Sequence, residues 1–230
     1  AAPMVAAEVP RPARTLVLGC GSIGQAVVPL MIRDLGIEPR SIRVVEMADT
    51  RHRIADSIAA GVTYEQAAVT RENLTSFLAE RLSSGDMLLD LAWNIDANTI
   101  IGWCRNAGVR YLNTSVEVWE PYTNISEQEP TSRTLYARHM AMRQMIQSWG
   151  DNSGPSAIVE HGANPGWVSH EVKFALEELG AELLRLNLLE GATRDALTTA
   201  LAAGDHARIA EASGVKVIQI AERDTQARRL

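Results

Sequence analysis

The stretch TLVLGCGSIGQAVVPLMIR, residues 15–33, decides the fold. It opens with an apolar run, Thr15–Leu18, that is too short for a helix and is interrupted by Gly19, Gly21 and Gly24. Beyond the last glycine, apolar residues recur at helical spacing. The pattern therefore predicts a strand, a glycine turn and a helix.

Four further strands and three helices continue this alternation. Short apolar runs at residues 41–47, 62–69, 86–93 and 109–115 are typical of strands, and residues 50–60, 71–82 and 96–108 have helical patterns. Strands that alternate with helices of about a dozen residues predict an α/β fold, a Rossmann-type doubly wound parallel sheet.

The pattern changes from about Glu117 onward. A polar, proline-containing connection, an amphipathic helix, a sixth strand, two helical stretches and a last strand are predicted at residues 117–133, 134–150, 156–160, 167–180, 194–214 and 215–222. We expect a disordered lead-in at 1–13, an NAD-binding Rossmann domain at 14–150 and the beginning of a second α/β domain, for substrate and dimerisation, at 151–230. Because a strand is an unusual place for a domain to finish, the sequence is expected to be part of a longer protein.

Composition limits the function classes. The chain has 230 residues, of which 46% are hydrophobic. No apolar stretch is nearly as long as the roughly 18 residues that a membrane-spanning helix needs. Its beginning lacks the pattern of a signal peptide. Two cysteines in separate elements, Cys20 and Cys104, favour a reducing compartment, so we expect a cytoplasmic protein. The net charge of −6 argues against nucleic acid and is compatible with a cationic ligand.

The glycine turn has the context that dinucleotide binding requires, between a strand and a helix. Gly19 permits the tight turn, Gly21 lets the backbone approach a pyrophosphate, and Gly24 allows the helix to pack closely on the strand. The helix N-terminus presents unpaired N–H groups to phosphate, which places Ser22 and Ile23 among the expected cofactor-binding residues. The alternative is that these glycines serve only turn geometry and packing.

Glu46 ends the second predicted strand, about where an acid takes the ribose hydroxyls of a dinucleotide. A carboxylate there repels a 2′-phosphate, so NAD is favoured over NADP. Arg43 and Arg51 lie close enough in the sequence to leave NADP open. Glu46 could also be an ordinary surface carboxylate.

Polar residues follow the later strands, where the ligands of a parallel sheet bind. They are Trp93, Asn94, Asp96, Thr114, Ser115, Glu117, Glu160, His161, Asn164, Glu222 and Asp224. This rim is rich in carboxylates and amides and suits a substrate that carries ammonium groups. Acids at solvated strand ends are also common without a ligand.

Three other features favour structural interpretations. No histidine or cysteine has metal-ligand spacing, so no metal site is expected. His161 could be an acid or base, although a hydrogen bond to local backbone is favoured. Cys20, inside the glycine turn, is more typical of a small filler than of a nucleophile.

Four motifs follow the glycine turn in order: LAWNID at residues 91–96, NTSVEVWEP at 113–121, HGANPG at 161–166 and IAERDTQ at 220–226. With them the chain resembles the N-terminal half of bacterial homospermidine synthases, from about Thr15 to the last residue. The resemblance implies a saccharopine-dehydrogenase-like architecture, a homodimer and tightly held NAD.

The resemblance also implies a transferase whose small-molecule substrate is a diamine. NAD would oxidise one putrescine to an imine, a second putrescine would displace ammonia, and reduction would give homospermidine. Glu117 and Asn164 resemble family pocket residues, and Glu222 the main partner of a substrate ammonium group. Thr114 and Asn164 are expected near the cofactor. Some family members carry aspartate where this chain has Asn94, so a charge there is in doubt, although the amide could still position the nicotinamide or an amine.

Two alternatives stay open. One is a saccharopine- or carboxynorspermidine-type dehydrogenase, whose carboxylate substrates would favour arginines on the rim. The other is that these residues form only an NAD-binding and dimerising module, inactive without the remainder of a longer protein.

Overall fold

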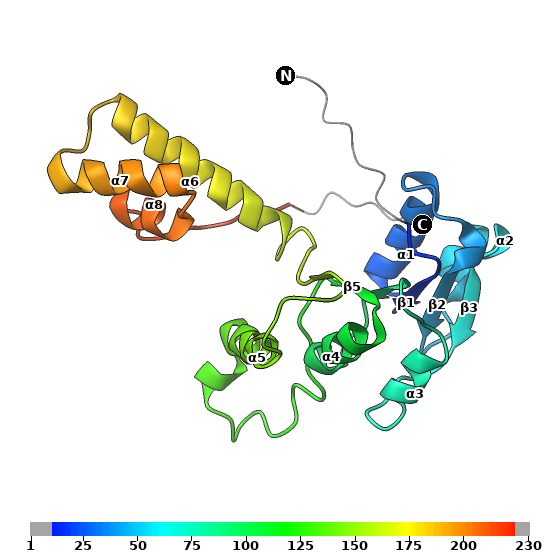
Figure 1. The fold of residues 1–230 in the computed structure, drawn as a ribbon. Helices are drawn as coiled ribbons and strands as arrows, with labels where there is room; N and C mark the ends of the chain where they lie inside the picture. Colours follow the sequence, from blue (N-terminus) through cyan, green and yellow to red (C-terminus); the bar gives the residue numbers. More distant parts are fainter. Residues whose placement is uncertain (1–10, 224–230) are drawn as a thin grey trace. The chain divides into compact units, whose positions relative to one another are not determined.

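The computed structural model describes residues 11–223 and contains one six-stranded parallel sheet (Figure 1). The strands are β1 (Thr15–Leu18), β2 (Ile42–Glu46), β3 (Thr63–Gln66), β4 (Met87–Asp90), β5 (Arg110–Asn113) and β6 (Ala157–Ile158). Their order, β3-β2-β1-β4-β5-β6, is that of the doubly wound dinucleotide-binding fold. The predicted fold class is confirmed. The predicted lead-in at 1–13 lies mostly outside the described residues.

Helices connect the strands as predicted, with shorter bounds. They are α1 (Ser22–Arg33), α2 (Ala55–Ala59), α3 (Leu74–Ala79), α4 (Ala97–Ala107) and α5 (Leu135–Ser148), with short 3₁₀ turns at Pro39–Ser41, Arg51–Ile54 and Pro130–Arg133. Local chemistry sets the ends of α4. The Asp96 carboxylate accepts a hydrogen bond from the Thr99 N–H at 2.7 Å, and Gly108 ends the helix at φ +73°.

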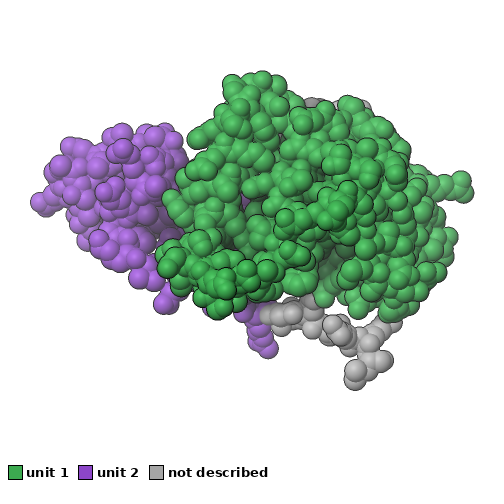
Figure 2. Space-filling model, turned by 90° about the horizontal axis from the view of Figure 1, so that it is seen from below, with its two compact units in different colours: residues 1–161 green, residues 162–230 purple. Residues whose placement is uncertain are grey.

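The chain divides into two compact units, residues 1–161 and 162–230 (Figure 2). Because β6 joins the sheet, the first unit continues past the boundary expected between residues 150 and 151. The second unit contains α6 (Trp167–Arg185), α7 (Gly191–Ala203) and α8 (His206–Ala212). The assignment of substrate binding and dimerisation to it stays a prediction.

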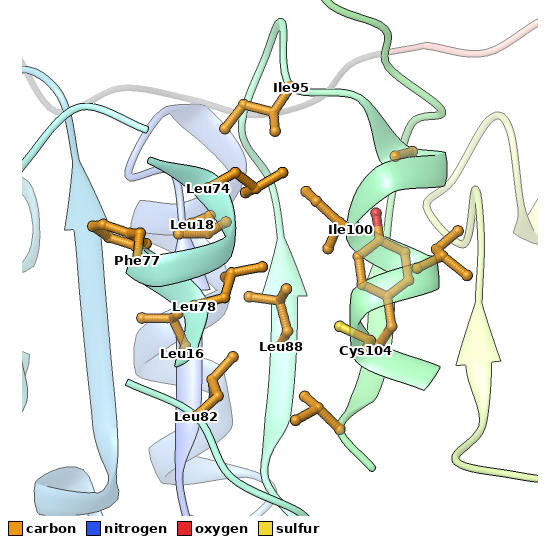
Figure 3. Close-up of a cluster of buried hydrophobic side chains, with 14 of the residues drawn as sticks. Leu16, Leu18, Leu74, Phe77, Leu78, Leu82, Leu88, Ile95, Ile100 and Cys104 are labelled. Carbon is orange, nitrogen blue, oxygen red and sulfur yellow. The ribbon is translucent and has the colours of Figure 1, made fainter. Parts of the chain in front are cut away.

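Apolar side chains cover both faces of the sheet, as expected for parallel strands with helices on each side. Leu16 and Leu18 of β1 belong to a cluster with α3 and α4, whereas Val17 between them belongs to a cluster with α1. Figure 3 shows the first cluster, in which Leu88 of β4 lies close to Leu78 of α3. The sheet that carries the strand ends is therefore anchored on two sides.

The second unit has a small core of its own. Buried residues of α6, α7 and α8 form it: Leu176, Leu197, Ala200 and Ile209. At Gly180 a Cβ atom would lie 3.2 Å from the Leu197 side chain, so this glycine lets α6 approach α7 closely. No helix described between residues 11 and 223 combines the length and apolarity that a membrane crossing demands.

The last predicted strand, residues 215–222, is wrong. These residues are not a strand, and Val217 and Ile218 are exposed. The apolar pattern is present, but a strand needs a neighbour that takes its hydrogen bonds. Among the described residues of the second unit, every regular element is a helix.

Shortening a buried leucine should test the packing of the sheet. Leu88 is fully buried, so Leu88→Ala is expected to lower the free energy of unfolding by about 2–5 kcal/mol. Leu35, which is 60% exposed, is the control, and Leu35→Ala should change it by less than about 0.5 kcal/mol. Urea unfolding followed by circular dichroism measures both, and equal effects would contradict this packing.

Candidate functional site

The glycine turn brings α1 unusually close to β1. Gly19 has φ +99°, and a Cβ atom on it would lie 2.7 Å from the Leu91 carbonyl oxygen. A Cβ on Gly24 would collide with the carbonyl oxygen of Gly19. Around Gly21, by contrast, nothing lies within 4 Å of the Cβ position. Two of the three glycines are therefore required by the backbone itself, and the third faces open space.

Glu46, at the end of β2, is joined to the glycine turn by hydrogen bonds. Its carboxylate accepts from the Cys20 N–H at 2.8 Å and from the Ala48 N–H at 3.2 Å. A carboxylate can accept about four hydrogen bonds, so capacity for ribose hydroxyls is left. The acid predicted from spacing alone therefore lies beside the predicted phosphate-binding turn.

The arginines that left NADP open are engaged elsewhere. Arg43 forms an ion pair with Glu65 at 3.0 Å, and Arg51 one with Asp49 at 2.8 Å. The arginine that reaches the turn is Arg53, whose Nη1 donates to a carbonyl oxygen at 3.3 Å. Sequence reasoning missed Arg53, because nothing in its local pattern shows which way the side chain points.

The carbonyl that Arg53 contacts belongs to Cys20, which is completely buried. Burial raises the pKa of the Cys20 thiol, and a hydrogen bond from Thr50 opposes this only in part. A reactive thiolate is thereby disfavoured. The geometry supports the interpretation of Cys20 as a filler.

A cavity of about 380 Å³ opens beside the turn. Its polar part is formed by Gly19, Gly21 and Glu46, and its apolar part includes Val69 and Trp119. Ser22 and Ile23 begin α1 directly after Gly21. Of the predicted cofactor-binding residues, Gly19, Gly21 and Glu46 thus line one cavity, whereas Ser22, Ile23 and Gly24 do not; contact of any of them with a cofactor stays a prediction.

Asn94 also lines this cavity, from the loop after β4. It adopts the left-handed region at φ +66°, which asparagine tolerates well. Its side-chain oxygen accepts a short hydrogen bond from the Glu120 N–H. The amide thus contacts the long connection after β5, a role that its sequence motif did not predict.

A buried chain of hydrogen bonds links the ends of β4, β5 and β6. The Tyr111 hydroxyl donates to Asp90 at 2.8 Å, and the Asn113 amide donates to the Tyr111 oxygen at 2.8 Å. The Asn113 side-chain oxygen accepts from the Glu160 N–H at 2.8 Å. The Glu160 carboxylate then contacts His139 of α5 at 2.5 Å. Of these residues, sequence reasoning had singled out only Glu160.

Burial dominates the chemistry of Asp90. Burial, with a smaller contribution from the nearby Glu117 carboxylate, raises the pKa of this carboxyl group to about 6, although hydrogen bonds from Tyr111 and the Ala92 N–H act in the opposite direction. Near neutral pH the group is therefore close to its titration range. Burial likewise raises the pKa of Cys104 to about 12, so this thiol stays protonated.

Glu117 and Thr114 follow β5 in the same unit. The Ser115 hydroxyl donates to the Glu117 carboxylate at 2.6 Å, and the Glu117 carbonyl accepts from the Ala97 N–H at 3.1 Å. These contacts fix Glu117 over the start of α4. Thr114 is half-buried at the strand end.

Asn164 and Glu222 lie in the second unit and contact each other. The Asn164 amide nitrogen donates to the Glu222 carboxylate at 3.1 Å, across 58 positions of sequence. The HGANPG loop that carries Asn164 is closed by the Trp167 N–H, which donates to the Gly162 carbonyl at 2.8 Å. Two predicted catalytic residues are thus brought together. Asp224 lies outside the described residues.

Comparison with known proteins agrees with this geometry. Residues 15–158 match the family model described as the saccharopine dehydrogenase NADP binding domain. The chain belongs to this family. The matched residues cover all six strands of the sheet and the glycine turn.

Homospermidine synthases are among the relatives of the chain, which confirms the resemblance drawn from its motifs. Those of Mesorhizobium japonicum and Blastochloris viridis are each 33% identical over 92% of this chain. The chain spans 42% of their length. The structure of the Legionella pneumophila homospermidine synthase in complex with NAD is 28% identical, with a TM-score of 0.59, over 77% of this chain and 34% of that one.

Substitution of Gly21 should separate nucleotide binding from folding. Because the Cβ position is open, Gly21→Ala is expected to fold normally while a methyl group enters the space next to a bound pyrophosphate. We expect NAD affinity to fall at least about 10-fold, measured by calorimetry. Gly102→Ala in α4, also in open space, is the matched control and should leave affinity unchanged. Equal affinity in both variants would contradict this placement.

Stability should depend on pH through Asp90. The pKa is raised on folding, so between about pH 4 and 6 the unfolded chain loses its proton first and the wild type loses stability as pH rises. Asp90→Asn lacks this effect. Its free energy of unfolding, relative to that of the wild type, should therefore rise by roughly 3 kcal/mol from the lower to the upper end of that pH range. Urea unfolding at several pH values measures the difference. The exposed control Asp195→Asn should show no such trend; a trend as large as that of Asp90→Asn would contradict the assignment.

Proposed function

We propose that the chain is the N-terminal part of a homospermidine synthase, a transferase that condenses two putrescines with release of ammonia. The observation that carries this proposal is the contact between Asn164 and Glu222. These residues come from the two most distinctive motifs of the resemblance, far apart in the sequence. Their convergence is what a shared amine-binding role requires.

NAD is the proposed cofactor of the first unit. The turn at Gly21 offers open space for a pyrophosphate beside the N-terminus of α1, and Glu46 offers a carboxylate for the ribose hydroxyls. The same negative charge disfavours a 2′-phosphate. When bound, NAD would supply an acceptor, and later a donor, for the hydride of the carbon next to an amine.

Carboxylates are proposed to hold the diamine. Glu222 would accept hydrogen bonds from a substrate ammonium group, since a carboxylate has capacity beyond its bond from Asn164. The Asn164 amide would fix the orientation of that carboxylate. In the first unit, Glu117, fixed by Ser115, is a separate carboxylate proposed for amine binding. Each such carboxylate complements one ammonium group of a diamine.

The reaction is testable with the protein expressed from its whole gene, supplied with NAD⁺ and putrescine. Homospermidine and ammonia without accumulating NADH, identified by mass spectrometry and absorbance, are expected. NADH that accumulates with an oxidised amine would instead favour the dehydrogenase alternative. Residues 1–230 assayed separately show whether this part acts alone.

Asn164→Ala is expected to lower turnover about 10- to 100-fold, the effect of losing one hydrogen bond to a charged group. NAD affinity should change little. The exposed Asn152 is the control, and Asn152→Ala should match the wild type in both measurements. Unchanged turnover in Asn164→Ala would exclude the proposed role of the loop.

A further inference from the structure

We infer that Trp119 closes the adenine end of the nucleotide cavity and that Asn94 and Arg71 hold it there. The inference rests on the proposed binding of a dinucleotide to the first unit. It assigns a nucleotide-binding role to part of the long connection after β5, residues 117–120, which we call the strap. It also gives Asn94 the role of a positioning residue, and not of a residue that touches the diamine.

The order of groups in a dinucleotide fixes where the base must lie. With the diphosphate at Gly21 and the ribose at Glu46, the adenine extends past Glu46 on the side away from the turn. The cavity lining includes Met47, directly after Glu46, together with Val69 and Trp119. A flat base with apolar faces fits an apolar wall that includes an aromatic ring.

Trp119 reaches this place only through the strap. The other residues that line the cavity belong to β1 and β2 or to the segments after β1 to β4, whereas Trp119 follows β5. The ring is half-buried and packs against the core cluster that contains Ile95. A side chain that follows β5 thus joins a cavity otherwise lined by residues from the first four strands and the segments after them.

Three contacts hold the end of the strap, Trp119 and Glu120, to residues that follow β3 and β4. Asn94, after β4, accepts a hydrogen bond from the Glu120 N–H. Arg71, after β3, pairs with the Glu120 carboxylate at 3.6 Å and lies 5.6 Å from the Trp119 ring centroid. The exposed ion pair is weak, and the hydrogen bond to Asn94 adds to it. The start of the strap is held separately by the Ala97 N–H, which donates to the Glu117 carbonyl at 3.1 Å.

The test measures the affinity of ADP-ribose, which contains the adenine end and no nicotinamide. Trp119→Ala is expected to weaken binding about 5- to 100-fold, as for loss of one base–aromatic stack. The matched control is Trp149→Ala: Trp149 packs against the same core cluster and also lies beneath an arginine, but does not line the cavity. Its affinity should equal that of the wild type.

Asn94 is tested by substitutions that suit its backbone. Asn94→Gly tolerates φ +66° but removes the acceptor, and should weaken ADP-ribose binding. Asn94→Asp keeps an acceptor oxygen and should retain affinity.

Fluorescence separates contact with the base from a merely structural role. ADP-ribose should quench tryptophan emission in the wild type and in Trp149→Phe, and much less in Trp119→Phe, which keeps an aromatic ring and its affinity. Wild-type affinity in Trp119→Ala, or equal quenching in Trp119→Phe, would overturn the inference. No binding of ADP-ribose to the wild type would instead overturn the nucleotide site itself, and this inference with it.

Discussion

The absence of side chains at two glycines sets the geometry on which the nucleotide site depends. Gly24 lies against the carbonyl of Gly19, and Gly19 lies against the carbonyl of Leu91 after β4. A Cβ atom on Gly24 would push α1 away from the turn, and one on Gly19 would push the turn away from the backbone that follows β4. Because α1 begins so close to the end of β1, its N-terminal N–H groups lie at the edge where a parallel sheet binds ligands. Close backbone packing at these glycines thus sets the position of the proposed phosphate site.

Main-chain hydrogen bonds then organise the polar part of the cavity. Glu46 accepts from the turn itself, through the Cys20 N–H, so β2 and the turn hold each other without a ligand. The apolar part depends on a different kind of support. There Asn94 and Arg71 hold the end of the strap, and the base site depends on a loop that follows β5. We therefore expect the phosphate half of the cavity to be more rigid than the base half.

Local patterns predicted what local physics determines. The glycine turn, Glu46 and the alternation of strands and helices were readable because turn geometry and burial act over a few residues. Arg53, Trp119 and the chain from Asp90 to His139 were not, since each acquires its role from partners 20 or more positions away. The same limit explains the error at residues 215–222, where an apolar pattern could not show that a partner strand was missing.

At the edge of the sheet, a side chain takes over where the backbone hydrogen bonds between β5 and β6 end. β6 has only two residues, and its register pairs Tyr111 and Leu112 with Ala157 and Ile158. One residue further along β5, Asn113 continues the attachment: its side chain accepts from the Glu160 N–H, and its carbonyl accepts from the His161 N–H at 3.0 Å. The left-handed backbone of Glu160, at φ +54°, turns the chain out of the strand at this point.

If β6 were longer, the backbone would stay extended at Glu160 and would not turn out of the sheet there. The short strand instead leaves the Glu160 carboxylate buried within the first unit, where the Val116 N–H and His139 can reach it. A buried charge needs such partners. The last residues of the first unit are therefore fixed by polar contacts, and the loop that carries Asn164 begins directly after a firmly held position.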